Sequence, residues 1–249
     1  MIVVKTKDQI DKMRKAGRVV AAVLQLMSES IRPGVTTAYL DRLAEEEIVR
    51  RGATPAFKGY RGYPATICAS VNEEVIHGIP GDRVLAEGDI IGIDVGAVVD
   101  GYCGDAAATF PVGAISQESE RLISTTREAL EVAIKTCRVG KRIGDISHAV
   151  QSYVEAQGYS VVRDFVGHGI GRNMHEDPQV PNFGLPGTGP RLRPGLTIAI
   201  EPMVNEGTIE VEVLANEWTV VTSDRKRSAH FEHTVLITDD GPEILTVLR

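Results

Sequence analysis

The segment that decides the fold comprises residues 88–110, which read GDIIGIDVGAVVDGYCGDAAATF. Two β-branched, apolar runs flank Asp100-Gly101, a dipeptide typical of the two-residue turn between antiparallel strands. One run carries Asp94 and the other carries Asp105. A loop of residues 100–101 places Asp105 opposite Gly96 and diagonal to Asp94, whereas a loop of residues 99–100 places the two acids directly opposite. Both registers put the carboxylates on one face, within roughly 5–8 Å at Cβ.

Two carboxylates this close repel each other, and the pKa of one rises unless a cation lies between them. The simplest alternative is an exposed hairpin whose two acids are solvated. The apolar residues on both sides of each acid, such as Ile93 and Ala106, favour a buried hairpin instead.

The chain carries the same order of patterns twice. Apolar periodicity predicts two helices over residues 8–31 and 37–52, and two more over 116–137 and 143–158. Each pair precedes a glycine-rich, strand-like region. The two halves, about 1–112 and 113–249, are therefore expected to form one α/β domain over residues 1–249.

Short motifs strengthen this internal repeat. His77 and His168 each precede Gly-Ile, and Asp94 and Glu201 each follow a glycine by six residues. Asp105 and Glu232 each begin a similar run, which extends the match to a third motif. We therefore expect a pseudo-two-fold axis, with His168 in the repeat position of His77 and the acids brought to the centre.

The four acids lie in apolar strands, where carboxylates are rare unless they are paired, hydrogen-bonded or bound to a metal. A salt bridge at a strand edge would explain any single acid, but four related acids favour a shared cation. His168, between two glycines, adds a nitrogen ligand. This oxygen-rich set suits a pair of Mn²⁺, Fe²⁺, Co²⁺ or Zn²⁺ ions better than a thiolate zinc site does.

The set Asp94, Asp105, His168, Glu201 and Glu232 resembles the five-ligand metal centre of the type 1 methionine aminopeptidases. Supporting motifs are FKGYRGYP at 57–64, SVNEEVIHGIP at 70–80, GHGIG at 167–171, HEDPQV at 175–180 and EP at 201–202. The likeness spans nearly the whole chain and matches the short bacterial form. It implies the pita-bread fold, in which two pseudo-symmetric α/β halves share a curved antiparallel sheet with outer helices.

The resemblance also assigns roles. Asp94 binds one of two divalent ions (Co, Mn, Fe or Zn), His168 and Glu201 bind the other, and Asp105 and Glu232 bridge them. Glu201 is the general base for a metal-bridged hydroxide that attacks the methionine carbonyl.

Further residues are assigned to the substrate by the same resemblance. His175 stabilises the oxyanion, and His77 contacts the leaving amide. The methionine pocket is expected to contain Tyr60, Tyr63, Cys68, Met174 and Trp218. Met174 stands where some relatives carry Phe. A monovalent cation is expected near Asn72 and Ser228.

The implied activity is removal of the initiator methionine from nascent polypeptides whose second residue is small. The expected partners are nascent N-termini, with transient ribosome contact, and the protein is expected to be a monomer. A prolidase or X-Pro aminopeptidase shares the five ligands, although such relatives usually carry an additional N-terminal domain. A non-catalytic RNA or ribosome adapter on the same fold is the other alternative, but such proteins are expected to have lost metal ligands.

The composition limits the class of protein and the compartment that can be expected. With 27 Lys and Arg against 34 Asp and Glu, the formal net charge is −7, which argues against a nucleic-acid-binding protein. Three widely spaced cysteines without a CxxC pair suit a reducing compartment. No apolar stretch near the N-terminus resembles a signal peptide or a membrane span. A cytoplasmic protein without membrane contact is expected.

Overall fold

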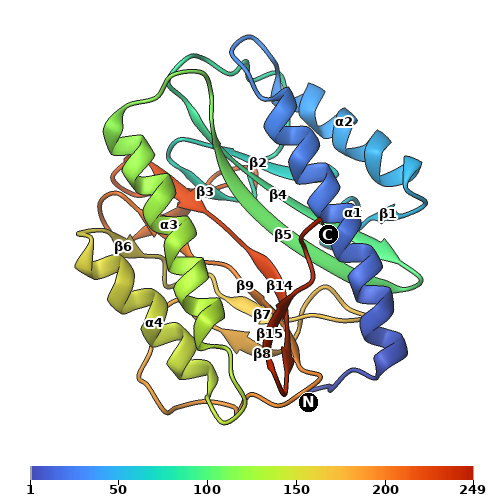
Figure 1. Cartoon of the computed structure of the whole chain (residues 1–249). Coiled ribbons are helices and arrows are strands. Elements are labelled where there is room, and N and C mark those ends of the chain that lie inside the picture. Colours follow the sequence, from blue (N-terminus) through green and yellow to red (C-terminus); the bar gives the residue numbers. More distant parts are fainter. Residues whose placement is uncertain (1, 249) are drawn as a thin grey trace.

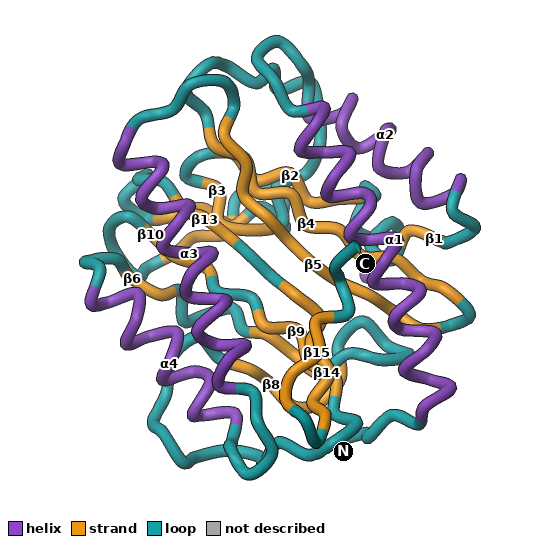
Figure 2. Tube along the Cα trace, in the orientation of Figure 1, coloured by secondary structure: helices purple, strands orange, loops and turns teal. Residues whose placement is uncertain are grey.

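A computed structural model describes residues 2–248. Four helices lie on the outside of the molecule and the strands lie between them (Figures 1 and 2). The helices are α1 (Lys7–Ser30), α2 (Thr37–Arg50), α3 (Gln117–Thr136) and α4 (Ile143–Ala156). They occupy the positions that the apolar periodicity predicts. Among the described residues, no helix combines the length and apolar character needed to cross a membrane.

The strands form two larger and two smaller antiparallel sheets. The first-half sheet joins β1 (Thr54–Pro55), β2 (Ile67–Val71), β4 (Ile90–Val99) and β5 (Tyr102–Pro111). The second-half sheet runs β15 (Gly241–Ile244), β14 (His233–Thr238), β9 (Thr197–Ile200), β7 (Gly167–Gly169) and β8 (Glu176–Val180). One smaller sheet joins β13 (Ser228–His230), β10 (Met203–Asn205) and β6 (Ser160–Val161). The other joins β11 (Val211–Val213), β12 (Val220–Thr222) and β3 (Glu74–Ile76). A 3₁₀ turn covers Tyr60–Gly62.

The β4–β5 hairpin turns at residues 100–101, which settles the register. Asp105 pairs with Gly96, and Asp94 pairs with Ala107. Both turn residues have positive φ, 51° and 76°, as the favoured hairpin turn requires. The two acids therefore lie diagonally on one face of the hairpin, the first of the two predicted registers.

The two halves meet along β5 and the segment before β14. Ala107 and Glu232 exchange backbone hydrogen bonds of 3.3 and 2.8 Å. On one side of this pair, the Thr109 hydroxyl donates to the His230 carbonyl and accepts from its N–H. On the other side, the Thr234 hydroxyl does the same for Asp105. This reciprocal pattern places a pseudo-two-fold axis at the Ala107–Glu232 pair.

The axis corrects two details of the predicted repeat. Asp94 and Glu201 are equivalent as predicted, but Asp105 corresponds to His230, and Glu232 corresponds to Ala107. A register shift of two residues keeps side chains on the same face of a strand, so the alternation of apolar and polar residues does not reveal it. The predicted equivalence of His77 and His168 is also wrong. His77 follows β3, which pairs with β12, whereas His168 lies on β7, which pairs with β9.

Each half has a core beneath its own helix pair. The first core joins α1 and α2 to the first-half sheet through residues such as Val20, Leu40 and Ile93. The second joins α3 and α4 to the second-half sheet through residues such as Leu130, Val150 and Ile198. The helices therefore bury the outer face of each sheet and leave the inner face for the centre of the molecule.

Helix α1 approaches the C-terminal segment at Gly17. A Cβ atom at this position would lie 2.2 Å from the Leu245 carbonyl oxygen, a backbone atom. Alanine normally stabilises a helix interior relative to glycine by about 0.5–1 kcal/mol. At Gly17 the close backbone contact reverses that preference.

We predict that Gly17→Ala lowers the free energy of unfolding by about 1–3 kcal/mol, the usual cost of overpacking. Urea denaturation measures the change. Arg18→Ala, at the neighbouring exposed position of the same helix, is the control and should shift stability by less than about 0.5 kcal/mol. A Gly17→Ala protein more stable than wild type would contradict the packing described.

Candidate metal centre

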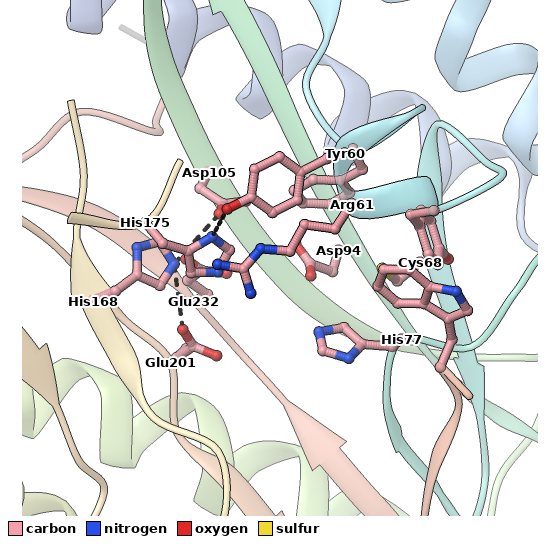
Figure 3. Close-up of a pocket in the computed structure, with 13 residues that line it drawn as sticks. Tyr60, Arg61, Cys68, His77, Asp94, Asp105, His168, His175, Glu201 and Glu232 are labelled. Atoms are coloured by element: carbon pink, nitrogen blue, oxygen red, sulfur yellow. Dashed lines mark hydrogen bonds and ion pairs between the residues drawn. The ribbon is translucent and has the colours of Figure 1, made fainter. Parts of the chain in front are cut away.

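Five predicted ligands from both halves line one cavity of about 150 Å³ (Figure 3). Asp94 and Asp105 come from the β4–β5 hairpin, and His168 comes from β7. Glu201 directly follows β9, and Glu232 directly precedes β14. The pseudo-symmetric strands thus deliver four carboxylates and one imidazole to the same place.

The backbone around His168 is held tightly by its neighbours. A Cβ at Gly167 would lie 2.4 Å from the Ala199 oxygen, and one at Gly169 would lie 2.1 Å from the Asp177 oxygen. Only glycine fits at either position, so β7 lies close to both of its partner strands. This close approach fixes where the imidazole enters the cavity.

The hydrogen bond of His168 determines which ring nitrogen is free. Its Nδ1 lies 2.9 Å from the Gly169 carbonyl oxygen, which can only accept, so Nδ1 carries the proton. Nε2 is then unprotonated, and burial lowers the pKa of the ring to about 4. Nε2 lies 3.8 Å from Asp105 Oδ2 and 3.7 Å from Glu201 Oε1. These distances are too long for hydrogen bonds and leave room for an ion between the groups.

The carboxylates are buried without enough donors. Asp94 Oδ1, Asp105 Oδ1 and Glu232 Oε1 are buried oxygens that have no hydrogen-bond partner among the described residues. Burial raises the pKa of Asp94 to about 7. Burial, followed by repulsion from neighbouring carboxylates, raises the pKa values of Asp105, Glu201 and Glu232 well above their usual range.

These residues fit divalent cations. Asp105, His168 and Glu232 each offer a ligand atom, and the three atoms lie within 4.8 Å of one another. Carboxylate oxygens and a neutral imidazole nitrogen are the donors that first-row divalent ions bind. A cation would satisfy the partnerless oxygens and remove the repulsion between them.

Two further histidines line the cavity. The His77 ring packs edge-on against Phe165 and Trp218, and burial lowers its pKa to about 4. His175 lies 4.3 Å from His168 between ring centroids, and its Nδ1 lies 2.9 Å from the Tyr60 hydroxyl. Burial lowers the pKa of His175 as well. Both rings are therefore neutral hydrogen-bonding groups at the cavity wall near pH 7.

The apolar wall of the cavity contains most of the residues predicted for the methionine pocket. Tyr63, Cys68 and Trp218 form one apolar cluster and line the cavity. The Tyr63 hydroxyl lies 3.0 Å from the Ile67 carbonyl oxygen and 3.1 Å from the Gly78 carbonyl oxygen, and these two acceptors share its single proton, which fixes its ring. A cavity of this volume holds a molecule about the size of benzene, so it accommodates one side chain of moderate length.

Met174 is not among the residues that line this cavity, and its assignment to the methionine pocket stays a prediction. This side chain is buried and packs with Ile170 and Tyr102 beneath the cavity wall. Its Cε fills the space left by Gly96, where an added Cβ would lie 2.8 Å away. Phe57 and Arg61 line the cavity instead and were not predicted. Both belong to the FKGYRGYP motif, which contained the signal.

The two residues expected near a monovalent cation are adjacent. The Ser228 N–H donates to the Asn72 carbonyl at 2.8 Å, and the Asn72 backbone has φ of 57°. The Ser228 hydroxyl lies 2.9 Å from Asn205 Oδ1. The cation site itself stays a prediction.

Acidic residues that fit divalent cations line a cavity large enough for one side chain, an arrangement typical of metal-dependent hydrolases. Comparison with known proteins places the chain in the same class. Residues 11–239 match the profile of Metallopeptidase family M24. The methionine aminopeptidase of Clostridium perfringens is 55% identical over 249 residues, 100% of both chains. The crystal structure of methionine aminopeptidase from Thermotoga maritima has a TM-score of 0.99 and 52% identity, covering 100% of both chains. The chain belongs to metallopeptidase family M24, and its resemblance to the methionine aminopeptidases is confirmed.

The fold extends to more distant proteins. The prolidase from Pyrococcus furiosus has a TM-score of 0.82 at 23% identity, over 99% of this chain and 66% of that one. This likeness concerns the fold alone. It confirms the predicted pita-bread architecture.

Metal affinity is predicted to depend on pH. Because the buried carboxylates have raised pKa values, the metal-free folded state binds more protons than the unfolded chain. The contribution of Asp94 to stability is full below about pH 4 and is lost as the pH rises through about 7, and the contributions of Asp105 and Glu232 change in the same direction. Metal ions must displace these protons, so Mn²⁺ should bind more tightly at about pH 8 than at about pH 6.

Isothermal titration calorimetry in two buffers with different heats of ionisation measures both the affinity and the protons released. We expect proton release on binding, and more of it at the lower pH. Affinity that is independent of pH, with no proton release, would show that the carboxylates are already ionised without metal.

Proposed function

We propose that this protein removes the N-terminal methionine from polypeptides whose second residue is small. The observation that carries the proposal is the junction of an apolar wall with the acidic cluster in one cavity. An unbranched thioether can fill the space between Tyr63, Cys68 and Trp218. The scissile bond then lies beside the carboxylates.

The residues that would hold two divalent ions are those of the acidic cluster. Asp94 would bind one ion, His168 and Glu201 would bind the other, and Asp105 and Glu232 would contact both. When bound, such ions acidify a water molecule and polarise a carbonyl group. The identity of the metal, among Co, Mn, Fe and Zn, is left open by the donor set.

The chain's own residues handle the protons and the developing charge. The Glu201 carboxylate accepts a proton from the attacking water and passes it to the leaving nitrogen. The His175 Nε2–H donates to the carbonyl oxygen as that oxygen gains negative charge. His77, on the opposite wall, contacts the leaving amide.

Substrate choice is predicted to depend on the second residue. Methionine in the cavity brings the next side chain beside the acidic cluster, where a long or charged group would be desolvated without a partner. Met-Ala-Ser should be cleaved and Met-Lys-Ser should not, and EDTA should abolish activity until Mn²⁺ or Co²⁺ is returned. Cleavage of Ala-Pro in preference to Met-Ala-Ser would support the prolidase alternative. Intact metal binding without hydrolysis of either peptide would support a non-catalytic protein.

His168 and His175 are predicted to differ in what their loss removes. His168→Ala deletes a ligand nitrogen, so metal content and activity should fall together. His175→Ala should keep both metals and lower kcat by about 10²–10³-fold, the usual cost of losing an oxyanion donor. Metal analysis and steady-state kinetics of both variants measure the difference. Loss of metal from His175→Ala, with full occupancy in His168→Ala, would reverse the two assignments.

We propose further that the protein acts as a cytoplasmic monomer of one catalytic domain on nascent N-termini. The proposal includes transient ribosome contact and a monovalent cation near Asn72 and Ser228. The absence of a CxxC pair and the net charge of −7 support a cytoplasmic enzyme that does not bind specific nucleic acids.

A further inference from the structure

Tyr60 makes a contact that a wall residue of the methionine pocket does not need. Its hydroxyl lies 2.9 Å from His175 Nδ1. The two rings are also stacked, with centroids 5.5 Å apart and an interplanar angle of 22°. Figure 3 shows the hydroxyl directed at the imidazole. Among the described residues, His175 is the hydrogen-bond partner of this hydroxyl.

The turn that carries Tyr60 is built to hold it. The Tyr60 N–H donates to Phe57 O at 2.8 Å, and the Tyr60 carbonyl accepts from Tyr63 N–H at 2.9 Å. Arg61 lies in the left-handed region, at φ 51° and ψ 22°, which non-glycine residues seldom adopt. Its guanidinium lies over the Tyr60 ring, 5.4 Å from the centroid. The ring is therefore fixed by backbone bonds on one side and by a cation on its face.

We propose that Tyr60 is a positioning residue that sets the tautomer of His175. The Tyr60 hydroxyl donates a hydrogen bond to Nδ1 of His175, so the neutral imidazole carries its own proton on Nε2. This inference rests on the proposed function, because it gives His175 the N–H that an oxyanion requires. In the other tautomer, a lone pair on Nε2 would face the oxygen and repel its developing charge.

The tautomer of the neighbouring histidine, His168, is also set by its hydrogen-bond partner, which is a backbone carbonyl. The Gly169 carbonyl can only accept, so it forces the proton of His168 onto Nδ1 and leaves a lone pair on Nε2. At His175 a hydroxyl replaces the carbonyl, and the arrangement is inverted. Two adjacent histidines thus present opposite groups, a metal-binding lone pair and a hydrogen-bond donor.

The test compares two deletions of a single hydroxyl from the same cavity. Tyr60→Phe removes the bond to His175 and keeps the stacked ring. Tyr63→Phe removes a hydroxyl of the same cavity wall that lies within hydrogen-bond distance of the Ile67 and Gly78 carbonyls and beside the Cys68 thiol. ¹⁵N spectra of Zn²⁺-loaded protein labelled at histidine report the tautomer, because protonated and unprotonated ring nitrogens resonate at separate frequencies. The His175→Gln variant identifies the His175 signals by their loss.

We expect the wild type and Tyr63→Phe to show His175 protonated on Nε2, and Tyr60→Phe to show a mixture of tautomers. With Met-Ala-Ser, Tyr60→Phe should lower kcat by about 10- to 100-fold, the range seen when the orienting partner of a metal-binding histidine is removed, and change KM by less than about twofold. In a His175→Ala background the same change should have no further effect on kcat, because the two residues act as one unit.

The proposal is overturned if wild-type His175 carries its proton on Nδ1, or if Tyr60→Phe leaves both tautomer and kcat unchanged. It is also overturned if the two substitutions lower kcat additively, since Tyr60 would then act independently of His175. Should the wild type fail to cleave Met-Ala-Ser, the proposed function fails while the ¹⁵N spectra still decide the tautomer.

Discussion

The structure depends on the placement of four carboxylates side by side in one cavity, where little water reaches them. Isolated ionised groups in such a place are strongly unfavourable, and neutral ones forfeit most of their hydrogen bonds. Three of their oxygens are buried without a donor among the described residues. Divalent cations resolve the conflict, because they supply positive charge to every oxygen at once. Metal binding and the stability of the central strands are therefore coupled.

The pseudo-symmetric fold explains how such a cluster can be assembled. Each half contributes a pair of antiparallel strands, and the halves join at the Ala107–Glu232 backbone pair. The threonine hydroxyls on either side complete the ladder where the strands diverge. Helices cover the outer faces, so the inner faces are left to carry chemistry (Figure 1). The two halves share the path of the backbone but not the chemistry of their side chains, since Asp105 corresponds to His230.

Sequence patterns predicted this fold to the level of its four helices and its central hairpin, because apolar period and Asp-Gly turns are local signals. The five residues that line the cavity as predicted ligands were likewise visible in the sequence, since acids inside apolar strands stand out. The position of Met174 was not predictable, because the direction of a side chain in a loop depends on space left by a distant glycine, Gly96. The hydrogen bond between Tyr60 and His175 joins residues 115 positions apart, so no local pattern in the sequence predicts it.

The central claim is that the acidic cluster exists to hold two cations, and anomalous diffraction from crystals loaded with Mn²⁺ tests it most directly. Data collected on both sides of the manganese absorption edge locate the ions without reference to activity. The account predicts two anomalous peaks in the cavity, one in contact with Asp94 and the other with His168 and Glu201, and both in contact with Asp105 and Glu232. Crystals of active protein with no peak among these carboxylates would contradict it.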